Sequence, residues 1–325
     1  MRVTMPRLRG GLIPFAVVVV LAVLAVLPVL GMPQEWLLYL LIFFIYLALA
    51  NMWNLLAGYS GLICLCPAAF VGLAGYTVAI GTWVGLPFYL GIIAGAIIAA
   101  AFALLISFPV FRLRGIYFAI GTLVLPEILK AWFLLWRPVG GVMVGRGAGY
   151  AVKGVEGVSL AEWYWVALVI GIASIFLMRT ILSTKLGLGL AAIRDNDNTA
   201  ASSGIDVFRL KLYSFLIGAF IMGIAGAVFY TYSGYIEPIG AFNIRWLLVA
   251  LLATVIGGEG IEGGPIIGTA IVVILQFLLA RYAGISLLIQ GALLIIIMLL
   301  APQGIVGYVQ KTRAYRPLSK LVTGR

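Results

Sequence analysis

Long apolar runs separated by short polar segments occupy almost the whole chain. A helix that crosses a bilayer needs about 20 consecutive, mostly apolar residues. Such runs predict ten spans, at residues 11–30, 36–57, 62–83, 88–110, 116–136, 163–178, 212–234, 246–256, 266–280 and 285–301. The eighth run is short and leads into the sequence GGEGIEGGP, so we expect a broken or half-length helix there. The pattern predicts an all-α polytopic membrane protein with about ten transmembrane helices.

The polar segment LGLGLAAIRDNDNTAASSGIDVFRLKLYSF, residues 186–215, interrupts this apolar pattern near the middle of the chain. Its residues favour a short helix, because Asp195 or Asp197 can cap the N-terminus, Ala200 and Ala201 propagate it, and Gly204 ends it. The alternative is an ordinary solvated loop between spans six and seven.

The composition supports the membrane assignment. The 325 residues are 64% hydrophobic and 10% charged, and the mean hydropathy is +1.19. A soluble domain carries about 25% charged residues. The formal net charge of +11 comes from basic residues at the ends of apolar runs, a topology signal that indicates no nucleic-acid partner.

The positions of Lys and Arg orient the chain, because cytoplasmic loops carry an excess of them. With both termini in the cytoplasm, that side receives Arg2, Arg7, Arg9, Arg112, Arg114, Arg179, Lys185, Arg194, Arg209, Lys211, Lys311, Arg313, Arg316, Lys320 and Arg325. The outside receives Arg137, Arg146, Lys153, Arg245 and Arg281. We therefore expect one transmembrane domain over residues 1–310, with a cytoplasmic loop at 180–211, an outside loop at 137–162 and a basic cytoplasmic tail at 311–325 that meets membrane lipid.

Five spans precede the 180–211 loop and five follow it. Since five is odd, a duplication of the two halves would be inverted in the membrane, as in many transporters. The pattern is compatible with such an inverted 5+5 repeat. The segments after Asn54 and after Val255, both rich in small residues, occupy comparable places in the two halves.

Glycine clusters at residues 57–81 and 256–268 allow two interpretations. Gly and Pro permit an interrupted helix where backbone lines a cavity, which would place a substrate pathway there. Small residues also let helices approach closely without any ligand contact. Glu127 and Lys130 raise a similar choice, because they share one helix face inside an apolar run. They either mark the translocation path or form an ion pair whose lysine reaches the membrane surface.

Several kinds of chemistry are missing from the sequence. The chain has no histidine, the commonest proton shuttle and metal ligand, and it offers no catalytic residues. Cys64 and Cys66 lie in an apolar run where neighbours at i and i+2 of a helix point apart, so we expect neither a disulfide nor a metal site. A phosphate-binding G-x-x-x-x-G-K-[ST] loop is also missing, so the chain carries no ATPase of its own and binds no cofactor.

Five segments together resemble a known family, the permease subunits of ABC importers of the branched-chain amino-acid (LIV) type, which also includes urea and amide permeases. They are GLICLCPAAFVGLAGYTVAI, YFAIGTLVLPEIL, AAIRDNDNTAASSGIDVFRLKLYSF, VIGGEGIEGGPIIGTA and LLAPQGIVG, spread over residues 51–307. The sequence VGGVMVGRG is weakly similar to the family's T-G-G loop. Cys66 and Pro67 depart from the family, which has Gly and often His or Gln at these places.

The resemblance implies a multi-pass protein of a bacterial-type inner membrane. Its partners would be a second related permease, two cytoplasmic ATPase subunits that use ATP, and a periplasmic substrate-binding protein. The 187–211 loop would be the coupling helix that docks the ATPases, through Arg194, Asp195, Asp197, Ala200, Ala201, Gly204, Arg209 and Lys211. Candidate substrate-pathway residues are Asn54, Gly58, Gly61, Pro67, Phe70, Gly72, Gly75, Tyr76, Thr77, Glu127, Lys130, Gly140 and Gly141.

The expected function is the translocation step of an ATP-driven importer for branched-chain or other neutral amino acids. A urea or short-chain amide permease shares the same motifs and stays an alternative. A stand-alone channel or secondary carrier would also suit ten spans, but it would not need a helix-forming docking segment in the cytoplasm. An intramembrane enzyme is disfavoured, because without histidine no pair of nucleophile and base is recognisable.

Overall fold

A computed structural model describes residues 20–113, 115–140 and 144–279, and the stretches 288–292, 295–296, 299 and 304–308. The expectations for Gly141, the basic tail and most of the first span lie outside these residues. The elements are, in chain order, α2 (Gln34–Asn54), η1 (Leu55–Tyr59), α3 (Pro67–Trp83), α4 (Phe88–Val110), α5 (Ile116–Leu135), η2 (Arg146–Ala148), β1 (Tyr150–Ala151), α6 (Leu160–Ser183), α7 (Lys185–Asp195), α8 (Asp197–Ser202), α9 (Val207–Ser233), β2 (Tyr235–Ile236), α10 (Pro238–Ala241), α11 (Arg245–Gly257) and α12 (Gly264–Leu279).

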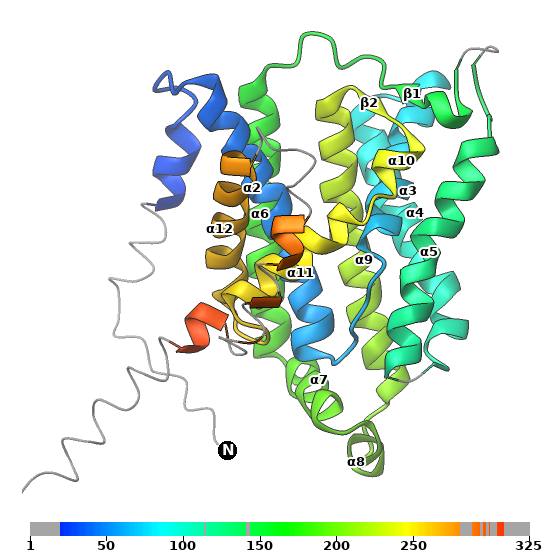
Figure 1. The fold of residues 1–325 in the computed structure, drawn as a ribbon, viewed down its shortest axis with the longest axis vertical. Coiled ribbons are helices and arrows are strands. Elements are labelled where there is room, and N and C mark those ends of the chain that lie inside the picture. Colours follow the sequence, from blue (N-terminus) through cyan, green and yellow to red (C-terminus); the bar gives the residue numbers. More distant parts are fainter. Residues whose placement is uncertain are drawn as a thin grey trace, which may run out of the picture.

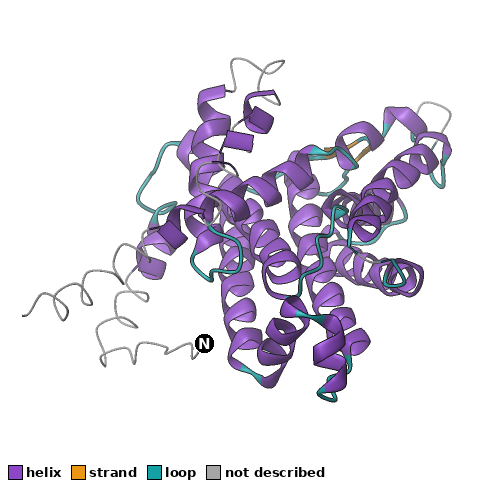
Figure 2. Ribbon diagram, turned by 60° about the horizontal axis from the view of Figure 1, so that its bottom comes forward, coloured by secondary structure: helices purple, strands orange, loops and turns teal. Residues whose placement is uncertain are grey.

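The long helices run roughly alongside one another, and the two ends of the bundle differ (Figure 1). The short helices α7 and α8 project from one end, whereas β1, β2 and α10 lie at the opposite end. The strands pair antiparallel, with Tyr150 opposite Ile236. These two-residue strands are a small addition to the expected helical fold, and Figure 2 shows that the sheet is one small patch in a helical molecule.

Six helical segments in the described part of the chain are long and apolar enough to cross a membrane. They are Gln34–Tyr59, Phe88–Val110, Ile116–Leu135, Leu160–Ser183, Val207–Ser233 and Pro238–Gly257, and α12 is a shorter apolar helix. The prediction of a polytopic helical protein is therefore confirmed. The count of ten spans and the inverted repeat stay predictions.

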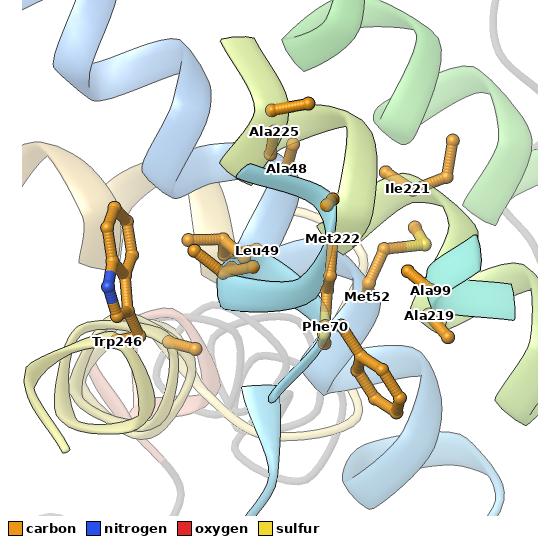
Figure 3. Packing of buried hydrophobic residues seen from close by; sticks show 14 of the residues in the cluster. Ala48, Leu49, Met52, Phe70, Ala99, Ala219, Ile221, Met222, Ala225 and Trp246 are labelled. Carbon is orange, nitrogen blue, oxygen red and sulfur yellow. The ribbon is translucent and has the colours of Figure 1, made fainter. Parts of the chain in front are cut away.

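The helices α2, α3, α4 and α9 form the centre of the bundle, and α6 packs on the outer side of α2. Their buried faces combine small residues with a few large ones, and Figure 3 shows Met52, Phe70 and Met222 among alanines of α2, α4 and α9. A side-chain Cβ at Gly226 of α9 would lie 2.5 Å from the Cα atom of Val71 in α3. The glycines of this region thus serve close helix packing.

The third expected span, residues 62–83, was wrong at its start. Gly61 has a positive φ of 69°, residues 61–66 are not helical, and α3 begins at Pro67. Proline has no backbone N–H and suits the first turn of a helix, where that N–H would have no helical partner. An apolar, non-helical segment, residues 61–66, therefore precedes α3.

The backbones of α11 and α12 approach each other more closely than other backbones in this part of the fold. A Cβ at Gly268 would lie 1.7 Å from the carbonyl oxygen of Ala253 and 2.9 Å from the amide nitrogen of Gly257. Backbone atoms cannot rotate away as a flexible side chain can. The two helices must separate if this glycine gains a side chain.

We expect Gly268→Ala to lower the free energy of unfolding by about 1–3 kcal/mol, the usual cost of overpacking. The midpoint of thermal unfolding of the purified full chain in detergent measures the effect. Gly263→Ala is the matched control, because a Cβ at Gly263 meets nothing within 4 Å. Equal midpoints for the two variants would contradict the packing argument.

Candidate functional site

The helices α7 and α8 form a hairpin, residues 185–202, that projects from one end of the bundle (Figures 1 and 2). The Asn196 side chain caps α8, since its Oδ1 accepts hydrogen bonds from the backbone N–H groups of Asn198 at 2.9 Å and Thr199 at 3.1 Å. The expectation that Asp195 or Asp197 is the cap was therefore wrong. Gly204, with φ of 82°, follows the end of α8 as predicted.

An apolar face fixes the hairpin to the bundle. Leu190 and Ile193 of α7 and Ala200 of α8 are buried, whereas Ala201 is exposed. The two alanines therefore do not share one exposed face. A hairpin anchored by buried apolar residues moves with the bundle rather than as a free loop.

One ion pair ties the hairpin to the start of α9, and a second lies within the start of α9 itself. Lys211 Nζ lies 2.5 Å from Asp197 Oδ2, and its side chain is 16% exposed. Arg209 Nε lies 3.0 Å from Asp206 Oδ2, with both side chains well exposed. Exposed pairs contribute little to stability, so the Lys211–Asp197 pair is the structurally significant one.

Arg194 connects the hairpin to the end of α2. Its Nη1 donates a 2.6 Å hydrogen bond to the carbonyl oxygen of Gly58, and its Nε lies 4.0 Å from Asp195 Oδ1. Gly58 belongs to η1, a single π-helical stretch that continues α2. The last carbonyls of a helix lack intrahelical donors, and the negative end of the helix dipole favours a cation there.

Asn54 joins the same place to the turn between α11 and α12. Its Nδ2 donates to the carbonyl oxygen of Ile261 at 3.1 Å, and its Oδ1 accepts from the Gly260 N–H at 2.8 Å. A Cβ at Gly58 would lie 2.5 Å from the Gly260 nitrogen. We call Asn54, Gly58, Arg194 and Gly260 the hairpin junction, because they connect α7, the end of α2 and the 258–263 turn.

Most of the other predicted pathway residues lie in helix packing. Phe70 packs on Phe215, and a Cβ at Gly72 or Gly75 would overlap the ring of Phe242 or Tyr230. Tyr76 is buried between aromatic rings, and Thr77 donates to the Leu73 carbonyl in its own helix. Gly140 lies in the loop after α5 with φ of 86°. These positions favour the packing interpretation for α3.

Glu127 and Lys130 form an ion pair on α5 as expected, and the Glu127 side chain is 58% exposed. Glu127 also lines a cleft of about 190 Å³ together with Leu65, Ala68 and Leu247. The pair therefore lies where the non-helical 61–66 segment meets α5 and α11. Whether it serves transport stays a prediction.

The two cysteines lie in that non-helical segment, so the helical geometry assumed for them was wrong. Cys64 Sγ and Cys66 Sγ are 3.1 Å apart, and both thiols are free and buried. The segment is held by two further hydrogen bonds, from Trp53 Nε1 to the Cys64 carbonyl and from Leu65 N–H to Thr122 Oγ1.

A larger cleft lies at the end of the molecule opposite the hairpin, near β2 and α10. Its volume is about 540 Å³, and its lining includes Tyr46, Phe229, Glu237, Arg245 and Trp246. Sequence analysis did not identify these residues as a site, and they come from three separate helices and a loop. The available signal was the pair of opposite charges, Glu237 and Arg245, on either side of the short sequence PIGAFNI.

We expect Asn54→Ala to leave the Gly260 N–H and the Ile261 carbonyl without their side-chain partner, at a cost of about 1–3 kcal/mol. Amide hydrogen exchange in residues 258–263 should then become faster in the full chain. Asn198→Ala on exposed α8 is the control and should leave that turn unchanged. Unchanged exchange in the Asn54 variant would show that the turn does not depend on this amide.

Comparison with known proteins adds independent information. The sequence model of the family described as branched-chain amino acid transport system, permease component, matches residues 36–301. The high-affinity branched-chain amino acid transport system permease protein LivM of Salmonella typhimurium is 27% identical over 86% of this chain and 71% of the relative. The LivM protein of Escherichia coli is 28% identical over 80% of this chain and 67% of the relative.

The LivH permease of Escherichia coli is 30% identical over 38% of this chain and 40% of the relative. No solved structure matches the chain. The family match covers most of the chain, and the relatives are permease components of transport systems. The chain therefore belongs to the family of branched-chain amino acid transport system permease components, and it is a membrane transport subunit, not an enzyme.

Proposed function

We propose that the chain is the translocation subunit of an ATP-driven importer for branched-chain or other neutral amino acids. The relatives named for branched-chain amino acid transport support the substrate class. In this proposal a second related permease completes the pathway, two ATPase subunits use ATP, and a periplasmic binding protein delivers the substrate. The excess of Lys and Arg at the hairpin end supports a cytoplasmic hairpin and cytoplasmic termini.

The observation that carries the proposal is the hairpin with its junction. A helix that projects from the bundle can be reached by a soluble partner, and Arg194 joins it to the Gly58 carbonyl at the end of α2. The 258–263 turn is held at the same place by Asn54. A force that a partner exerts on α7 and α8 would therefore be transmitted through direct contacts to three parts of the bundle.

Uptake of labelled leucine into proteoliposomes tests the whole assignment. We expect uptake to require this chain, its partner permease, the ATPase subunits, the binding protein and ATP. Leucine uptake that persists without ATPase subunits would instead identify a stand-alone carrier. ATP-dependent uptake of urea or acetamide without leucine uptake would identify an amide permease.

Charge reversal at the hairpin tests the coupling role. We expect Arg194→Glu combined with Asp197→Lys to reduce ATP-driven uptake at least about tenfold, because charge-assisted hydrogen bonds of about 1.5–3 kcal/mol are lost. Insertion into the membrane and ATPase subunit expression should be unchanged. Arg179→Glu, at the exposed end of α6, is the control, and normal uptake in the double variant would contradict the proposal.

Variants of the Asp197–Lys211 ion pair distinguish two roles of Asp197, holding the hairpin in place and contacting the ATPase. We expect Asp197→Lys alone to lower uptake, because two lysines then face each other. Adding Lys211→Asp rebuilds the pair with reversed polarity and should restore uptake if the pair holds the hairpin in place. Failure of this rescue would mean that Asp197 contacts the ATPase directly, and Arg179→Ala, which removes an exposed cation near the end of α6, serves as the control.

A further inference from the structure

The cleft at the end opposite the hairpin lies between α9, α11, α12 and the β2–α10 loop. It has a volume of about 540 Å³, within the range of about 300–1,000 Å³ usual for small-molecule sites. In Figure 1, α10 lies beside α9, and α11 runs from there toward α12. The cleft is thus formed where the chain changes direction before a short helix.

One side of the cleft is a fixed aromatic wall around Trp246, which is 7% exposed and labelled in Figure 3. The ring of Trp246 meets Phe229 edge to face at 4.8 Å and Tyr46 at 6.2 Å between centroids. Its Nε1 donates to the Gly240 carbonyl at 3.3 Å. Because these contacts fix its orientation, the indole offers a preformed surface to an aliphatic group or a cation.

Opposite charges line the same cleft. Glu237 caps α10, with Oε1 accepting from the Gly240 N–H at 2.9 Å, which leaves its second oxygen for another donor. Arg245 is the first residue of α11 and is exposed. In the described part of the chain no carboxylate forms an ion pair with Arg245.

The position of Arg245 is unfavourable for the helix itself. The N-terminus of a helix carries partial positive charge, so a cation there is not stabilised by the helix dipole. The same dipole strengthens the attraction of Arg245 for an anion. Asn243 Oδ1 accepts from the Arg245 N–H at 3.0 Å, which leaves the Asn243 amide nitrogen to donate, and Gln276 adds a second amide to the lining.

We propose that this cleft binds one α-amino acid in its zwitterionic form. The carboxylate lies on Arg245 and Asn243, the ammonium group on Glu237, and the aliphatic side chain on Trp246 and Phe229. A planar guanidinium matches a carboxylate through two parallel hydrogen bonds. The inference rests on the proposed function, since it names the chemical group that the permease would recognise, and it adds a binding site within the membrane subunit.

The charges predict a definite ligand selectivity. A zwitterion satisfies Glu237 and Arg245 together, whereas an amine or a carboxylate satisfies one of them and leaves the other without its partner. Urea and acetamide carry no charge. We therefore expect the full chain in lipid nanodiscs to bind labelled L-leucine saturably, with L-isoleucine and L-valine competing and isoamylamine, 4-methylpentanoate, urea and acetamide competing at least about tenfold more weakly.

Two variants that each remove one charge locate the site. Glu237→Gln keeps the acceptor oxygen that caps α10, and Arg245→Gln keeps a donor without charge, so each removes one charge of the cleft. We expect each variant to weaken leucine binding at least about tenfold. Glu162→Gln is the matched control, because Glu162 is also an acidic residue at the N-terminal end of a helix and does not line the cleft.

Binding and uptake are measured separately, so the two proposals can fail independently. Leucine uptake by the assembled transporter without saturable leucine binding by this chain would overturn the cleft and leave the transport function intact. The cleft proposal is also overturned if amines or carboxylates compete as well as leucine, or if both variants bind leucine as the wild type does. The ligand series is run on the wild-type chain and therefore does not depend on the folding of any variant.

Discussion

Two interruptions of helical backbone meet at Asn54, and the hydrogen bonds of this side chain support the arrangement of the helices around it. A membrane interior offers no water to satisfy free N–H and C=O groups, so irregular backbone there must find partners within the protein. Asn54 supplies both a donor and an acceptor to the 258–263 turn. Arg194 supplies a donor to the Gly58 carbonyl from the hairpin. The glycines at this place are required because the backbones are almost in contact.

This constraint gives the hairpin a mechanical role that an ordinary loop would not have. Leu190 and Ile193 pack α7 against the bundle, and Arg194 is the next residue after Ile193 in the sequence. A displacement of α7 therefore cannot be absorbed by the loop alone, since packed interiors are poorly compressible. The polar segment in the middle of an apolar sequence is thus part of the folded core on one face and open to a partner on the other.

Sequence analysis predicted the helices that are bounded by clear chemical signals. The run at 88–110 corresponds to α4 at both ends, because Pro87 and Arg112 flank it. It did not predict the non-helical 61–66 segment, since a short apolar run alone does not distinguish a helix from another buried conformation. The cap of α8 was assigned to the wrong neighbour, because Asp195, Asn196 and Asp197 have similar capping preferences. The local sequence does not determine which of the three residues caps α8. The residue at which α7 ends determines it.

The cleft around Trp246 could not be predicted for a different reason. Tyr46, Phe229 and Gln276 are far apart in the sequence, and each alone is an ordinary residue of a membrane helix. Their proximity depends on α11, whose 13 residues extend about 20 Å at 1.5 Å per residue. Its first turn carries Arg245 and Trp246, and its last residue, Gly257, leads into the turn that Asn54 holds.

The helix α11 therefore connects the two sites that the proposals concern. Thr254 Oγ1 donates to the Ala50 carbonyl of α2 at 3.1 Å, and Gly257 and Gly268 bring α11 against α12 without intervening side chains. Because α11 is short and packed this tightly, we expect a shift of the 258–263 turn to move Arg245 relative to Glu237, which lies outside α11 in the preceding loop. Changing that separation changes how well one ligand can satisfy both charges. The same contacts that stabilise the bundle thus provide a direct route from the hairpin to the cleft.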